Sequence, residues 1–203
     1  MTINLKKGEQ VSLTLSQFVI GIGWDIDIDS YNTIYQRIKR AISWVSNSSD
    51  IDFDIDVSVF ILGENKKLLS NEYFMIYNNL QSPDGAVKNI SCDTTPYPGC
   101  DIEEFLVDLS KINQNATEIV IVATIFDADK RCKNFGQVHN SFIRIYCPDN
   151  NEELLKYEVD EVFSIKTSIE IGRIFKCNGG WIFEAVSLGH RSGLEMYLNK
   201  YNN

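Results

Sequence analysis

The chain has 203 residues, of which 44% are hydrophobic and 11% aromatic, so it can bury the core of one domain and is not globally disordered. Its net charge of −9, from 28 acidic and 19 basic residues, excludes direct binding to nucleic acid or to an anionic membrane as a first hypothesis. No apolar run approaches the ~18 residues of a membrane-spanning helix, and polar residues interrupt any signal-peptide core near the N-terminus. We therefore expect a cytoplasmic protein without direct membrane insertion.

Short strand-like segments dominate the chain. They are rich in β-branched and aromatic residues and are bounded by Gly, Asn, Asp or Pro. In chain order they cover residues 11–15, 18–24, 52–62, 73–77, 86–90, 105–109, 118–126, 142–146, 154–157, 168–175 and 180–186. The pair Asn178-Gly179 between the last two favours a tight hairpin. Most connections are too short for a crossover helix, so the pattern predicts an all-β fold, a two-sheet β-sandwich of about ten strands.

Two segments have helical rather than strand periodicity. Apolar residues between Tyr31 and Val45 recur at helical spacing after Ser30, a suitable N-cap, which predicts a helix near 30–46. The apolar stripe of that helix can pack on the sandwich edge, or it can serve as a lid or a partner-binding surface. A short C-terminal helix is predicted near 192–201. We expect a single domain over 1–203, with a helical insertion at about 27–50.

The most informative motif is D-I-D-F-D-I-D at 50–56, with an aspartate at every second position. A strand sends alternate side chains to opposite faces, so the four carboxylates share one face, with neighbours roughly 6.5–7 Å apart. Nothing cationic lies nearby in sequence. Such a row requires either full solvation or a bound cation, and hard oxygen ligands suit Ca²⁺ best. Solvated surface acids remain the alternative on these grounds alone.

Further oxygen donors follow this motif. Residues 78–79 are a pair of asparagines at the end of a predicted strand, and the turn at 82–85 carries a carboxylate at its apex. Four more acids lie in a loop with two prolines and a glycine, at Asp93, Asp101, Glu103 and Glu104. An EF-hand is excluded, because starting from Asp52 its sixth and twelfth positions would be Val57 and Gly63, where Gly and Glu are needed.

Several longer strings resemble a known family. They are Trp24-Asp25, the DFDID run at 52–56, YNNLQSPDGAV at 77–87, the block 127–145 with NFGQV at 134–138, and the closing hairpin at 178–186. Together they are similar to the TerD family of tellurium-resistance and stress-response proteins over nearly the whole chain. The resemblance implies a TerD-like β-sandwich that binds Ca²⁺ without known catalytic chemistry. It also implies action through other stress-response proteins, in assemblies at the inner membrane surface.

The resemblance further implies a ligand set for one or two Ca²⁺ ions. Its members are Asp25, Asp52, Asp54, Asp56, Asn78, Asn79, Asp84, Asp93, Asp101 and Glu103. The chain departs from the family where Cys92-Asp93-Thr94 replaces the usual Gly-Asp-Asn and where Ile102 replaces a second Asp. Both changes weaken a second ion site. The segment 27–50 is also longer than in many relatives.

The function predicted from these observations is a non-catalytic calcium-binding stress-response protein. One alternative is a hydrolase that uses Mg²⁺ or Mn²⁺ between the same carboxylates, which would need an open coordination position and a base. The other is a module that binds a small ligand such as a cyclic nucleotide, although the chain has no glycine-rich phosphate loop. Residues 134–137 are expected to form a structural turn around a buried Phe135, in which Gly136 is free to take a positive φ.

Overall fold

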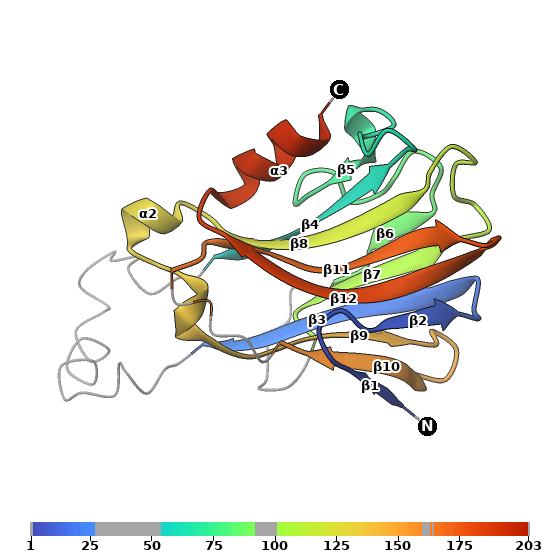
Figure 1. Ribbon diagram of the computed structural model, residues 1–203, viewed down its shortest axis with the longest axis horizontal. Coiled ribbons are helices and arrows are strands. Elements are labelled where there is room, and N and C mark those ends of the chain that lie inside the picture. Colours follow the sequence, from blue (N-terminus) through green and yellow to red (C-terminus); the bar gives the residue numbers. More distant parts are fainter. Residues whose placement is uncertain (1, 27–53, 92–100, 160–162, 164, 203) are drawn as a thin grey trace.

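The computed structural model describes residues 2–26, 54–91, 101–159, 163 and 165–202. Two six-stranded sheets pack face to face as a β-sandwich, which confirms the predicted fold class (Figure 1). The first sheet has the strand order β1-β10-β9-β3-β7-β6, and the second has the order β2-β12-β11-β8-β4-β5. Among the described residues, no helix is long and apolar enough to cross a bilayer.

Each of the two sheets contains six of the described strands. The first sheet contains β1 (Ile3–Leu5), β10 (Glu153–Glu158), β9 (Val138–Tyr146), β3 (Gln17–Ile26), β7 (Glu103–Asp108) and β6 (Val87–Asn89). The second contains β2 (Gln10–Leu13), β12 (Gly180–His190), β11 (Ser168–Cys177), β8 (Glu118–Ile125), β4 (Ile55–Leu62) and β5 (Phe74–Met75). Two α-helices, α2 (Ala128–Arg131) and α3 (Gly193–Tyr201), and the 3₁₀ turns Asn71–Tyr73 and Phe135–Gln137 complete the description.

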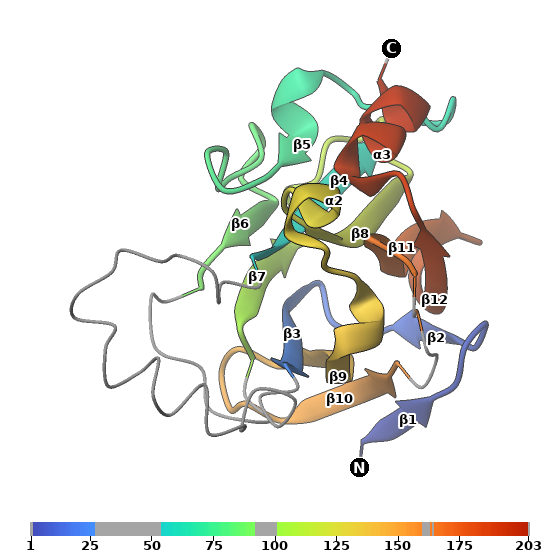
Figure 2. The ribbon, with the colours of Figure 1, turned by 90° about the vertical axis from the view of Figure 1, so that its left-hand side faces the viewer.

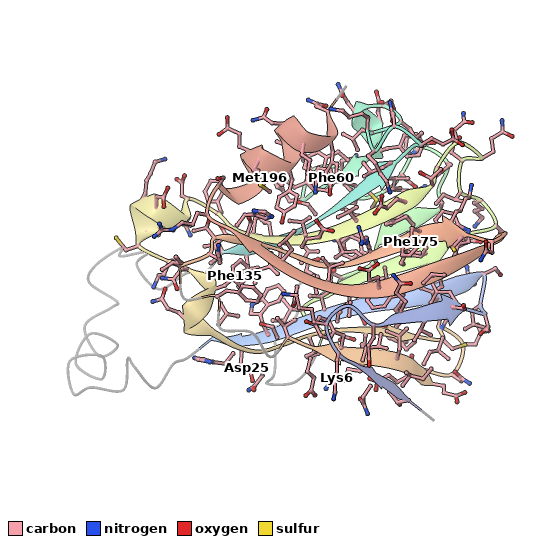
Figure 3. All side chains as sticks on the ribbon, viewed as in Figure 1. Lys6, Asp25, Phe60, Phe135, Phe175 and Met196 are labelled. Atoms are coloured by element: carbon pink, nitrogen blue, oxygen red, sulfur yellow. The ribbon has the colours of Figure 1, made fainter. Side chains whose placement is uncertain are left out.

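Strands β4 and β8 are neighbours in the second sheet and are almost entirely buried. One face of each strand contributes to the core between the sheets. The opposite face of β4 carries Phe60, whose ring lies 5.1 Å from the ring of Tyr201 in α3 (Figure 3). The helix therefore covers part of the outer face of the second sheet, over β4 and β8, and all eight residues of β8 are buried.

The predicted strands all correspond to observed strands, although their ends differ. The hairpin at Asn178-Gly179 is confirmed, with φ angles of 49° and 80° that match the two left-handed positions of a type I′ turn. The C-terminal helix is confirmed as α3. No sequence pattern predicts β1, a three-residue strand that pairs in parallel with β10, or the single helical turn α2.

The turn around buried Phe135 is confirmed, and it does not use the freedom of Gly136 to take a positive φ. Gly136 lies in a 3₁₀ turn and is not among the glycines with positive φ. The conformation is instead stabilised by Asn134, whose side chain accepts a hydrogen bond from the Gly136 backbone N–H, while Gln137 completes a capping box. The predicted helix near 30–46, the insertion at 27–50 and the site residues Asp52 and Asp93 lie outside the described residues.

Candidate metal centre

The described end of the aspartate motif forms the beginning of β4. Ile55 and Val57 are 7% and 5% exposed and face the core, whereas Asp54 is exposed and Asp56 is half-buried. This alternation is the one expected from a strand with one acidic face, and it holds over the four residues 54–57. Figure 2 looks onto this end of the sandwich, where β3 ends and β4 begins.

A third carboxylate approaches from the other sheet. Glu103 is the first residue of β7, where it pairs with Ile22 of β3. Its Oε2 atom accepts hydrogen bonds from Asn89 Nδ2 at 3.0 Å and from Ser91 Oγ at 2.8 Å. Sequence reasoning missed these two partners of Glu103. The spacing of Asn89 and Ser91 at the end of a predicted strand was the signal in the sequence that could have indicated them.

The three carboxylates interact electrostatically. The pKa of Asp56 is raised, first by burial and then by the negative charges of Asp54 and Glu103. The guanidinium of Arg131 in α2 lies 3.9 Å from Asp54, at the limit of an ion pair and too far for a hydrogen bond. The site therefore combines like charges from both sheets and raises the energy of the ionised form of Asp56.

This pKa shift predicts a pH dependence in metal-free protein. The folded chain holds the Asp56 proton more tightly than the unfolded chain does, so the penalty for ionising Asp56 acts above its folded pKa. As pH falls through that pKa, the penalty is relieved. We expect the stability deficit of the wild type relative to Asp56→Asn to shrink between about pH 7 and pH 4 in urea unfolding with a chelator. A difference that does not change with pH would contradict the shift.

Asp25 lies on β3, opposite His139 in the register with β9. Its Oδ2 atom accepts a hydrogen bond from Asn140 Nδ2 at 2.8 Å. Figure 3 shows Asp25 at the end of the molecule remote from the turn of the β11–β12 hairpin. Its carboxylate is therefore engaged by the neighbouring strand at the same end of the sandwich as the beginning of β4.

The donors of the 78–84 segment stabilise their own turns. The Asn79 amide donates to the backbone oxygens of Glu72 at 2.9 Å and Phe74 at 2.7 Å. Asp84 accepts from Ser82 Oγ at 2.6 Å and Ala86 N at 3.0 Å through Oδ1, and from Asn113 N at 2.8 Å through Oδ2. Both oxygens of Asp84 thus have partners within the protein, while Asn78 is exposed in the turn.

Asp101 contacts an arginine. Its carboxylate, with a side chain only 4% exposed, lies 2.9 Å from Arg144 Nε through Oδ1 and 2.5 Å from Nη2 through Oδ2. The described parts of the chain contain no group of three or more carboxylate, imidazole or thiol side chains that could hold a metal ion. Asp54, Asp56 and Glu103 interact electrostatically, but within the described ranges they do not form such a group.

The chain is similar to known bacterial proteins. The TerD domain matches residues 1–201. General stress protein 16U of Bacillus subtilis is 37% identical over 206 residues, which cover 99% of this chain and 97% of the relative. Tellurium resistance protein TerD of Serratia marcescens is 32% identical over 206 residues, with coverage of 99% and 97%.

The fold is also shared with a solved structure. A homologue of the telluride resistance protein TerD from Streptomyces coelicolor superposes with a TM-score of 0.63 at 15% identity, covering 92% of this chain and 98% of that one. At this identity the likeness concerns the fold alone. From the match of the domain along the whole sequence and the relatives above 30% identity, the chain belongs to the TerD family of tellurium-resistance and stress-response proteins.

Proposed function

We propose that the protein is a non-catalytic calcium-binding stress-response protein of the cytoplasm that acts through protein partners. The observation that carries the proposal is the row of aspartates at the beginning of β4, of which Asp54 is exposed and Asp56 half-buried. Burial, and then the negative charges of Asp54 and Glu103, raise the pKa of Asp56, which agrees with a site that lacks a neutralising cation. A divalent cation among these groups would remove their repulsion and stabilise all three in the ionised form. The names of the relatives support the stress-related role.

The donor set fits calcium. Asp54, Asp56 and Glu103 offer hard anionic oxygens, and Ca²⁺ takes 6–8 oxygen ligands in a flexible geometry. Asn89 and Ser91 both donate to Oε2 of Glu103, and among the described residues no hydrogen bond occupies its Oε1 atom, which can therefore bind an ion. In the proposal, Asp52 and Asp93 complete the ligand set. The ion would join the beginning of β4 to the beginning of β7 and so connect the two sheets.

Isothermal titration of chelator-treated protein tests the proposal. We expect Ca²⁺ to bind, and to bind more tightly than Mg²⁺, because Mg²⁺ needs a near-octahedral site and gives up its water reluctantly. The variant Glu195→Gln, which changes an exposed acid in the first turn of α3, serves as the control and should bind Ca²⁺ like the wild type. No heat of Ca²⁺ binding at millimolar concentrations would refute the proposal.

A further inference from the structure

Arg144 of β9 forms a bidentate contact with the carboxylate of Asp101. Its Nε atom lies 2.9 and 3.0 Å from the two carboxylate oxygens, and its Nη2 atom lies 2.5 Å from Oδ2. Such a bidentate contact fixes the orientation of the carboxylate as well as its position. Arg144 is separated from Asp101 by 43 residues, so the contact ties β9 to the residues just before β7.

The arginine is itself held in place. Its guanidinium lies 4.7 Å from the centroid of the Tyr146 ring, and its Nη1 atom is 3.5 Å from Glu153 Oε2. The Tyr146 hydroxyl in turn donates a hydrogen bond to Glu104. The side chains that surround the Arg144–Asp101 pair therefore come from β7, β9 and β10 of the same sheet.

A glycine provides the space for this contact. Gly21 of β3 pairs with both Arg144 and Glu104, and a Cβ atom at Gly21 would lie 2.5 Å from the carboxylate of Asp101. Any side chain at this position would collide with the carboxylate. The absence of a side chain at Gly21 lets Asp101 lie flat on the sheet within reach of Arg144.

The pair fixes the point at which β7 begins. Between Asp101 and Glu103, the Ile102 N–H donates to Ile22 O at 2.8 Å, and Glu103 then pairs with Ile22. Glu104 lies on the face that carries Arg144, so Glu103 is on the opposite face. We propose that Arg144 and Asp101 are a positioning pair for the cation site, because they hold the beginning of β7 and thereby the position of Glu103.

This inference rests on the proposed function, and it assigns Asp101 a role through Arg144 and not as a ligand. Calcium affinity of Arg144→Gln tests it. We expect the affinity to fall about tenfold or more, the size typical of removing a group that orients a ligand. Arg144→Lys should lose less calcium affinity than Arg144→Gln, because lysine keeps the positive charge but cannot make the bidentate contact.

Arg173→Gln is the matched control. Arg173 makes a similar contact with Glu184 on the second sheet, with Nη2 2.9 and 3.1 Å from the two oxygens. This variant removes the same charge from a strand, so it should alter stability while leaving calcium affinity unchanged. Thermal melting of each metal-free variant, followed by circular dichroism, shows whether the variant is folded. If Arg144→Gln is not folded, calcium affinity is measured on the more conservative variant Arg144→Lys.

The outcomes separate the two proposals. If the wild type binds no calcium, the proposed function fails. If the wild type binds and Arg144→Gln binds equally well, the positioning pair is refuted. Tighter binding by Arg144→Gln would also refute it, since it would mean that Asp101 is a ligand for which Arg144 competes with the ion.

Discussion

Changing Asp54 and Asp56 together to asparagine should abolish the stabilisation of the protein by calcium. In the wild type, an ion bound only by the folded state adds RT ln(1 + [L]/Kd), which is about 2.7 kcal/mol when free Ca²⁺ is 100 times the Kd. The double variant loses two of the three described carboxylates around the site, so its free energy of unfolding should be the same with Ca²⁺ and with chelator. Urea unfolding under both conditions measures the effect.

The same variant should behave differently without metal. In the wild type, burial and the charges of Asp54 and Glu103 disfavour the ionised form of Asp56. The double variant has neither aspartate charge, so without metal it should be at least as stable as the wild type. Asp149→Asn with Glu152→Gln is the control, because it removes two acidic charges from the exposed turn between β9 and β10. A calcium response that survives in the aspartate variant, or disappears in the control, would place the ion elsewhere.

Phe60→Ala should cause the largest loss of stability among the changes considered. Its side chain is fully buried, and its ring lies 4.7 Å from that of Phe74 and 5.1 Å from that of Tyr201. Truncating a buried phenylalanine costs about 3–5 kcal/mol, from lost burial and from the cavity that remains. The midpoint of urea unfolding, compared with that of the wild type, gives the value.

Phe126→Ala controls for the loss of an aromatic ring. Phe126 follows directly after β8 and is 52% exposed, so its truncation should change the free energy of unfolding far less. Equal losses for the two variants would mean that α3 does not pack on Phe60. The comparison therefore tests whether the C-terminal helix covers the second sheet in solution.

Local patterns were sufficient to predict most of the fold. The alternation in β4 places Ile55 and Val57 in the core and Asp56 at the solvent boundary, because the period of two is a property of any strand. The hairpin at Asn178-Gly179 is equally local, since two consecutive positive φ angles favour these residue types. Such features depend on residues that are adjacent in the chain, so they can be predicted from the sequence.

Long-range partners could not be predicted in this way. The sequence indicates no protein partner for the carboxylates of Asp84 and Asp101. In the structure, Asp84 accepts a hydrogen bond from Asn113, 29 residues away, and Asp101 contacts Arg144, 43 residues away. The approach of Glu103 to Asp56 likewise depends on how the two sheets meet. A row of acids therefore predicts where a cation can be attracted, whereas the choice among candidate ligands depends on tertiary contacts.

A crystal structure of the protein grown with calcium would show whether Asp54, Asp56 and Glu103 bind an ion. We expect anomalous density for an ion bounded by oxygens of Asp54, Asp56 and Glu103, with Asp101 still held by Arg144. The account would be contradicted by a structure in ample calcium in which these three carboxylates turn separately into solvent with no ion among them.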